Sequence, residues 1–214
     1  MSNSVIKVLI VDDHAIVREG VKQILADTSD FAVVGEAESG FEILKKIEVA
    51  RPDVIVLDIS MPKSPGLDIL GSVKRHHPKL PIVVLSMHRE KEYGPRLLRA
   101  GADGYVMKDA APAQLISALR KVCTGGKFVS EELAEHLAGA LEAGQHALPP
   151  HERLSDREYA VFRLIGQGKA VKEVADELSL SVKTVSTYRA RTLMKTGLNN
   201  NAEIVRYCIE RDLA

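Results

Sequence analysis

The first 123 residues alternate short apolar runs with longer amphipathic stretches. In the longer stretches apolar residues recur with the spacing of one helix face, as in Val17, Val21 and Leu25. Strands that alternate with helices form a parallel sheet that is covered on both faces. The pattern predicts an α/β doubly wound domain with a five-stranded parallel sheet over residues 1–124. The expected strands lie near residues 6–11, 32–36, 53–57, 81–85 and 104–107.

The pattern changes after Cys123. A Thr-Gly-Gly break is followed by SEELAEHLAGALEAG, which indicates a helix near residues 130–143 with Ser130 as its N-cap. Pro149 and Pro150 then favour an exposed stretch of chain. We therefore expect a linker over residues 125–153 that contains this helix and separates two domains.

Residues 154–214 carry no strand signal and predict a small all-α domain of four short helices. Ser155 with Glu158 forms a capping-box pattern at the start of the first. Two short helices, near 171–178 and 182–196, are separated by a tight turn, and a last helix is expected near 200–211. This spacing is the outline of a helix-turn-helix motif.

Side chains that can carry chemistry stand where the predicted strands end. In an open parallel sheet the carboxyl ends of the strands face one crevice, so these residues should converge. Three carboxylates in one crevice repel each other unless a divalent cation joins them, and an all-oxygen set suits Mg²⁺, or Mn²⁺ in its place. The pattern predicts a phosphoryl-transfer site. Its residues are Asp12, Asp13, Asp58, Ser86 and Lys108.

The predicted third helix of the second domain is locally basic. The whole chain has 29 basic and 29 acidic residues, yet residues 181–197 include four basic and no acidic side chains. A few such charges can anchor a module on nucleic acid, because binding to phosphates is mostly release of counterions, and hydroxyl groups can bond to phosphates or base edges. The candidate DNA contacts are Lys183, Thr184, Ser186, Thr187, Arg189 and Arg191.

The remaining composition bears on location. Cys123 and Cys208 fall in different predicted domains, which favours reduced thiols over a disulfide. The start of the sequence lacks the pattern of a secretory signal, and no apolar run approaches the roughly 18 residues of a membrane span. We expect a cytoplasmic protein with no membrane partner.

Several spaced motifs resemble a known family. Residues 5–123 resemble the receiver domain of two-component response regulators, through VDDH, LDISMP and GADGYVMKD. Residues 154–214 look like the LuxR-type helix-turn-helix, through LSDRE and EVADELSLSVKTVSTY. The order of the two parts is similar to that of the NarL/FixJ class of transcriptional regulators, and the resemblance covers nearly the whole chain.

The resemblance implies a role for each residue of the crevice. Asp58 would accept a phosphoryl group and become an acyl phosphate. Asp13 would bind Mg²⁺ directly, Asp12 would hold it through water, and the backbone carbonyl of Ser60 would supply a further oxygen.

It also implies a switch. Lys108 would pair with a phosphoryl oxygen, and Ser86 would donate its hydroxyl to the phosphoryl group and move toward it. Tyr105 would swing inward as Ser86 leaves its place. The bond from Ser86 to the phosphoryl group would thereby shift an equilibrium between two conformations of the surface.

The implied partners follow from the same resemblance. They are a cognate histidine kinase, double-stranded promoter DNA, a second copy of the chain when phosphorylated, and RNA polymerase. The protein would be a regulator rather than an enzyme. Family members often have lysine where this chain has Ser186, and can have lysine where it has Ala190. The last helix is either a dimerisation face or ordinary core.

Two alternatives compete with this interpretation. A phosphatase with an aspartyl-phosphate intermediate would place a second aspartate two residues after the nucleophile, where this chain has Ser60. A regulator that has lost phosphorylation would keep only its binding surfaces. The full set of crevice residues argues against that loss.

Overall fold

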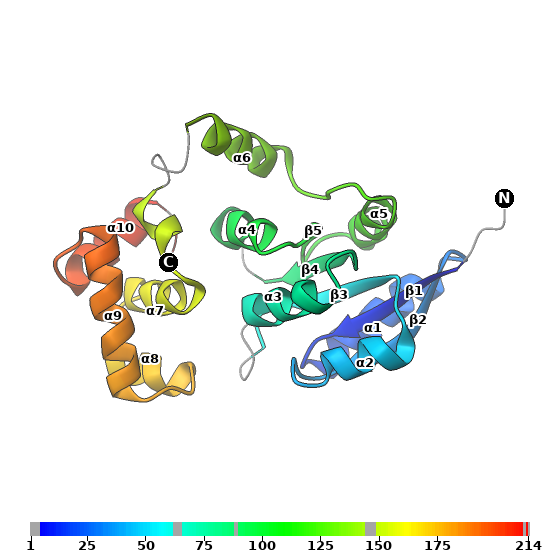
Figure 1. Ribbon diagram of the computed structural model, residues 1–214, viewed down its shortest axis with the longest axis horizontal. Helices are drawn as coiled ribbons and strands as arrows, with labels where there is room; N and C mark the ends of the chain where they lie inside the picture. Colours follow the sequence, from blue (N-terminus) through cyan, green and yellow to red (C-terminus); the bar gives the residue numbers. More distant parts are fainter. Residues whose placement is uncertain (1–4, 62–65, 88–89, 144–148, 212, 214) are drawn as a thin grey trace. The chain divides into compact units, whose positions relative to one another are not determined.

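The computed structural model describes residues 5–61, 66–87, 90–143, 149–211 and 213 (Figure 1). These residues belong to two compact units, Met1–Leu137 and Ala138–Ala214. The division lies inside the segment that we expected to be the linker. Of that segment, residues 144–148 lie outside the described part of the chain.

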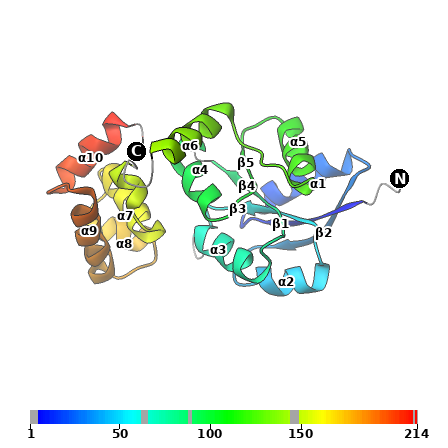
Figure 2. The same cartoon turned by 45° about the horizontal axis from the view of Figure 1, so that its top comes forward.

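The first unit contains a parallel sheet of five strands, as the apolar runs predicted. The strand order is β2-β1-β3-β4-β5, which puts the chain's first strand inside the sheet (Figure 2). Each predicted strand agrees with the structure to within one residue. The strands are β1 (Ile6–Val11), β2 (Phe31–Ala37), β3 (Val54–Asp58), β4 (Ile82–Ser86) and β5 (Gly104–Met107).

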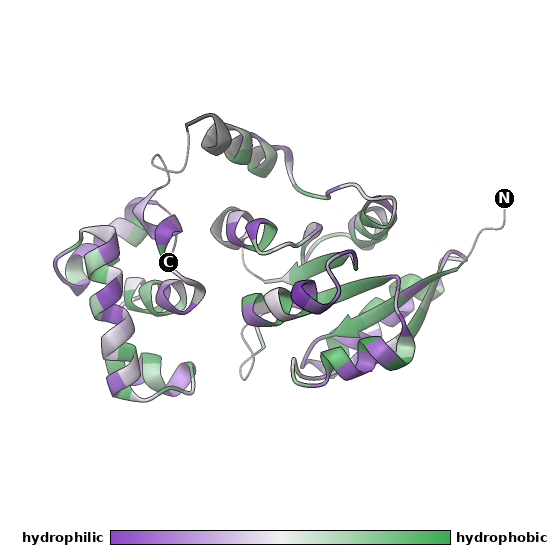
Figure 3. Cartoon of the chain, viewed as in Figure 1, coloured by the Kyte–Doolittle hydropathy of each residue, from purple (hydrophilic) through white to green (hydrophobic). Residues whose placement is uncertain are grey.

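Helices cover both faces of this sheet, and the apolar side chains of each strand divide between them. Val8 and Ile10 pack with α1 (Ala15–Ala26) and α5 (Pro112–Cys123). Leu9 and Val11 point the other way, because successive side chains of a strand alternate between faces. On that side the core is completed by α2 (Ile43–Ala50), α3 (Gly66–His76) and α4 (Glu90–Arg99). The central strands β3 and β4 are therefore apolar up to their last residues, Asp58 and Ser86 (Figure 3).

The chain that leaves α5 runs back along the edge of β5. The amide of Tyr105 donates to the Phe128 carbonyl, and the amide of Phe128 donates to the Asp103 carbonyl, each at 2.9 Å. Phe128 also packs against the core formed with α1 and α5. The expected linker from residue 125 thus begins as an addition to the sheet.

The helix expected near 130–143 is α6 (Glu131–Ala143), and its first turn is fixed to α4. The Ser130 hydroxyl caps it, accepting from the Leu133 amide at 3.1 Å, while the Ser130 amide donates to the Glu90 carboxylate at 3.1 Å. Leu133 is only 3% exposed. It lies over Gly94, where an added Cβ would come within 2.5 Å of its Cδ2.

The second unit is all-helical, as predicted. Its elements are a short 3-10 helix η2 (Pro150–Arg153) and the helices α7 (Asp156–Gly166), α8 (Val171–Glu177), α9 (Val182–Thr196) and α10 (Asn201–Glu210). The predicted capping box is present at α7, where the Ser155 amide donates to the Glu158 carboxylate at 2.8 Å. The core of this unit includes Tyr159, Phe162, Val174, Val185 and Ile204.

Each unit holds one free cysteine, half-buried Cys123 in α5 and buried Cys208 in α10. Burial raises the pKa of Cys123 to about 11 and that of Cys208 to about 12, so both are protonated at neutral pH. No helix in the described parts of the chain is both long and apolar enough to cross a membrane.

Candidate functional site: an aspartate crevice and a basic helix face

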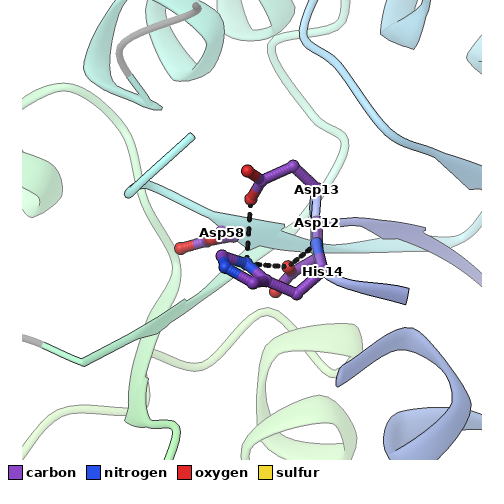
Figure 4. Close-up of side chains that lie close together, drawn as sticks. All are labelled: Asp12, Asp13, His14 and Asp58. Carbon is purple, nitrogen blue, oxygen red and sulfur yellow. Dashed lines mark hydrogen bonds and ion pairs between the residues drawn. The ribbon is translucent and has the colours of Figure 1, made fainter. Parts of the chain in front are cut away.

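Three acidic side chains meet at the carboxyl ends of the central strands. Asp12 directly follows β1, Asp13 comes next, and Asp58 is the last residue of β3. Together with His14 they offer one ligand atom each, all within 4.8 Å of one another (Figure 4). The structure therefore brings together the carboxylates that strand-end positions predicted to converge.

Asp58 is held in place at the end of β3. It is 1% exposed, its Oδ1 accepts from the Ser60 amide at 2.8 Å, and its Oδ2 accepts from Lys108 Nζ at 2.9 Å. The same Nζ lies 2.8 Å from Oδ2 of Asp12. Lys108 thus bridges two of the three aspartates, and one ammonium cannot balance the three carboxylates.

Burial and hydrogen bonds act in opposite directions on the pKa of Asp58 and on that of Lys108. Burial raises the pKa of Asp58, against the opposing effect of the bonds from Lys108 and the Ser60 amide. For Lys108, burial lowers the pKa, but the bonds to Asp12 and Asp58 outweigh it and the net pKa is raised. Lys108 therefore stays charged, while Asp58 holds its proton more tightly than an aspartate in water.

The oxygen atoms of the crevice fit a hard divalent cation. Oδ2 of Asp12 and Oδ1 of Asp13 are buried and have no hydrogen-bond partner among the described residues, an arrangement that needs an explanation in a folded protein. The nearest nitrogen atoms to them are Lys108 Nζ, 2.8 Å from Oδ2 of Asp12, and His14 Nδ1, 3.0 Å from Oδ1 of Asp13. Carboxylate oxygens suit Mg²⁺, whereas the His14 imidazole, 59% exposed, is a poor ligand for that ion.

The two predicted switch residues lie on neighbouring strands. Ser86 ends β4 and is fully buried, and its carbonyl accepts from the Lys108 amide at 2.8 Å. Tyr105 of β5 pairs with Val84 and is 4% exposed, packed in the core on the α4 side. Alternation along β4 puts the side chain of Ser86 on the same side as that of Val84, and so on the side of Tyr105.

Arg18 belongs to the crevice and was not anticipated from the sequence. It is 7% exposed on α1, and its Nη1 donates to the backbone carbonyl of Asp12 at 2.8 Å. The available signal was its spacing, because Arg18, Val21 and Leu25 share the buried face of α1. A cation at a core position of an amphipathic helix requires a partner inside the fold.

The second unit presents one polar face of α9. Ser181 caps the helix, accepting from the Thr184 amide at 3.0 Å. Val185 is fully buried and points into the core. The exposed positions follow the helical repeat along the opposite side and include Lys183, Ser186, Thr187, Ala190 and Arg191.

Three predicted DNA contacts have partners inside the unit. The Thr187 hydroxyl donates to the Lys183 carbonyl at 3.0 Å. The Thr184 hydroxyl lies 2.7 Å from the Ser181 hydroxyl and completes the helix cap. Arg189 is half-buried and donates through Nε to Asn201, the first residue of α10. The period of the helix turns Arg189 toward α10, so it does not share the outward face with Arg191.

Comparison with known proteins agrees with this geometry. Residues 8–120 match the response regulator receiver domain, and residues 152–208 match the bacterial regulatory proteins of the luxR family. The chain is 37% identical to the response regulator GacA of Pseudomonas syringae pv. syringae and 34% identical to the response regulator UvrY of Escherichia coli K12, each over 208 residues. The match covers 97% of this chain in both cases, and 97% and 95% of the two relatives.

Solved structures of response regulators also resemble this chain. RcsB of Salmonella enterica serovar Typhimurium, bound to the rprA promoter in the presence of the phosphomimetic BeF3⁻, superposes with a TM-score of 0.66 at 31% identity and covers 95% of this chain and 98% of its own. A further structure of Salmonella typhimurium RcsB gives a TM-score of 0.69 at 30% identity, covering 95% and 96%. The chain therefore belongs to the DNA-binding response regulators of two-component systems, with a receiver domain followed by a luxR-family domain.

Proposed function

We propose that Asp58 is the phosphoryl acceptor of this regulator and that a histidine kinase is the donor. The observation that carries the proposal is the position of Asp58, buried among two other carboxylates and bonded to Lys108. A carboxylate oxygen would attack the phosphorus of a phosphohistidine, and the bond from phosphorus to the imidazole nitrogen would break. The product is an acyl phosphate on Asp58.

The surrounding groups have separate tasks in this proposal. Asp12, Asp13, Asp58 and the Ser60 carbonyl would hold Mg²⁺, or Mn²⁺ in its place, which supplies neutralisation of charge on the transferring phosphoryl group. Lys108, freed from one of its carboxylates, would pair with a phosphoryl oxygen.

Ser86 and Tyr105 would respond to the phosphoryl group on Asp58. Ser86 would donate to the phosphoryl group, and Tyr105, already packed toward α4, would fix the changed surface. Such a bond biases an equilibrium between two states of the unit.

The output would be binding to promoter DNA through the outward face of α9, with Lys183, Ser186, Thr187 and Arg191 as contacts. The exposed side chains of this face combine positive charge with hydroxyl groups, which suits phosphates and base edges. A phosphorylated homodimer would place two such helices about one turn of DNA apart, ~34 Å. Control of transcription brings RNA polymerase as the further partner.

Intact-mass measurement after incubation with acetyl phosphate tests the receiver chemistry. We expect one added phosphoryl group on the wild type in Mg²⁺, and none on Asp58→Ala or without the metal ion. Asp27→Ala is the matched control, because Asp27 is an exposed aspartate at the end of α1.

The opposite result would be an adduct on Asp58→Ala, or no adduct on the wild type together with no binding of beryllofluoride in a parallel titration. The first outcome moves the acceptor to another residue. The second favours a regulator that works without phosphorylation.

A further inference from the structure

Buried Arg18 is the centre of a network that joins the backbone of Asp12 to two more exposed glutamates, Glu36 and Glu38. Its guanidinium makes three bonds in different directions. Nη1 donates to the Asp12 carbonyl at 2.8 Å, Nε to the Glu36 carboxylate at 3.0 Å, and Nη2 to the Glu38 carboxylate at 2.7 Å. The two glutamates, at the end of β2 and just after it, therefore aim the third arm of the fork at the chain leaving β1.

That chain segment carries two of the three crevice carboxylates. The Asp12 amide donates to the Ala37 carbonyl at 3.1 Å, and the Asp12 carbonyl accepts from Arg18. The peptide plane that joins Asp12 to Asp13 is thereby fixed through its oxygen. The side chain of Asp12 is also held, because its Oδ1 accepts from the His14 amide at 2.8 Å. Without the bond from Arg18, this plane could rotate and carry the carboxylate of Asp13 with it.

We propose that Arg18 is a positioning residue for the divalent cation. It does not touch the ion but holds the backbone of Asp12 and Asp13 in the geometry that presents their buried carboxylate oxygens together. Outer groups that orient ligands are worth about 10- to 100-fold in metal affinity in other proteins. Arginine suits the task because its planar fork can bond to a carbonyl and two carboxylates at once.

This inference rests on one element of the proposed function, the binding of a divalent cation by Asp12, Asp13 and Asp58, and does not depend on phosphorylation. The test is direct binding of Mn²⁺, followed by the electron paramagnetic resonance signal of the free ion, without any phosphoryl donor. Arg18→Met should raise the dissociation constant about tenfold. Circular dichroism at the temperature of the titration verifies that the variant is folded.

Lys22→Met is the matched control. Lys22 is a cation of the same network, one helical turn further along α1, and it bonds to Glu36 at 2.8 Å and to Glu19. Its substitution removes a positive charge next to Glu36 but leaves the Arg18 bond to Asp12 in place. The dissociation constant for Mn²⁺ should stay within about twofold of wild type, because Lys22 bonds to Glu19 and Glu36 rather than to the backbone of Asp12 and its charge is partly exposed.

Arg18→Lys keeps the charge for Glu36 and provides a second measurement if the methionine variant does not fold. One ammonium cannot replace the three-way fork, so Mn²⁺ binding should still weaken, by about threefold or more. Equal weakening by the Arg18 and Lys22 variants would overturn the proposal in favour of a general charge effect. Wild-type affinity in the Arg18 variants would overturn it as well. Failure of the wild type to bind Mn²⁺ would instead contradict the cation part of the proposed function, and with it this inference.

Discussion

At the scale of single residues, the carboxylates at the strand ends outnumber the single lysine ammonium that pairs with them. Asp58 is buried beside Asp12, and Lys108 is shared between them. Such clusters are common at functional sites, where ionised groups are kept together at a cost in stability. The cost can be measured, because it depends on pH.

Replacing Asp58 by asparagine should raise the stability of the metal-free protein at pH 7. Burial raises the pKa of Asp58 above its ordinary 3.8, so the ionised carboxylate destabilises the folded state at all pH values above that range. The gain should shrink as the pH falls toward 4, where the unfolded chain also becomes protonated. Urea unfolding at pH 7 and pH 4 gives the comparison, and a variant less stable than wild type at pH 7 would contradict the expected sign.

The two arginines of α9 should behave differently on substitution. Arg191→Ala should weaken DNA binding and reduce the slope of log affinity against log salt by about 1, as expected for one lost phosphate contact. Arg189→Ala should instead lower the free energy of unfolding by about 1 kcal/mol, because its bond to Asn201 is lost. Fluorescence anisotropy with a duplex at several salt concentrations, together with urea unfolding, separates the two. An unchanged salt slope for Arg191→Ala would remove this residue from the DNA face.

At the scale of elements, Glu158 joins α7 to α9. Its carboxylate accepts from the Ser155 amide at 2.8 Å and from Lys195 at 2.7 Å, and its side chain is 3% exposed. Burial alone would raise its pKa, but the bonds from Lys195 and the Ser155 amide outweigh burial, so the net pKa is lowered. The capping box therefore also carries a contact between two helices.

Glu158→Gln should lower the free energy of unfolding at pH 7 by about 1–2 kcal/mol. Because the pKa of Glu158 is lowered in the fold, its ionised form stabilises the protein above the ordinary pKa of 4.5, and this contribution is lost as the pH falls through the lower folded value. Denaturant unfolding between pH 7 and pH 3 should show the two proteins converging. Glu173→Gln is the control, since exposed Glu173 caps α8 through the Ala170 amide and should matter less. Equal losses at every pH would mean that charge is not the cause.

The sequence predicted the elements better than the details that join them. Each strand was recognisable because it is an apolar run that ends at a polar residue. The pairing of Phe128 with β5 escaped prediction because a single isolated bridge leaves no periodic pattern. Arg18 escaped because a cation on an apolar stripe gives no indication of its partners, and these come from β1 and β2. Arg189 was assigned to the DNA face on its charge, and its bond to Asn201 escaped prediction because charge alone does not give its angle around α9.

At the scale of the whole molecule, the first compact unit extends past the last helix of the doubly wound fold. The bonds of Phe128 and the buried side chain of Leu133 tie residues 125–137 to β5 and α4. This segment also covers the outer edge of β5, which would otherwise offer unpaired backbone groups to other chains.

A fragment that ends at residue 124 should therefore be less stable than one that ends at residue 137. It loses two backbone hydrogen bonds and the burial of Leu133, together worth about 3 kcal/mol. Thermal unfolding of the two fragments, with light scattering to detect association through the open edge, is the measurement. The full chain carrying Leu133→Ala serves as the intermediate case. Fragments of equal stability would mean that residues 125–137 contribute nothing to the first unit.

The placement of the two cysteines gives the protein a built-in pair of reporters. Half-buried Cys123 belongs to the first unit and buried Cys208 to the second, and burial keeps both thiols protonated. A thiol reagent reaches Cys208 only when the helix around it opens, and it reaches Cys123 more readily when α5 opens. The rate of labelling at each position, resolved by peptide mass, therefore follows the opening of one unit independently of the other. The effect of phosphorylation, metal ions or DNA on the labelling rates of Cys123 and Cys208 would show which of the two units opens less often, with no label engineered into the chain.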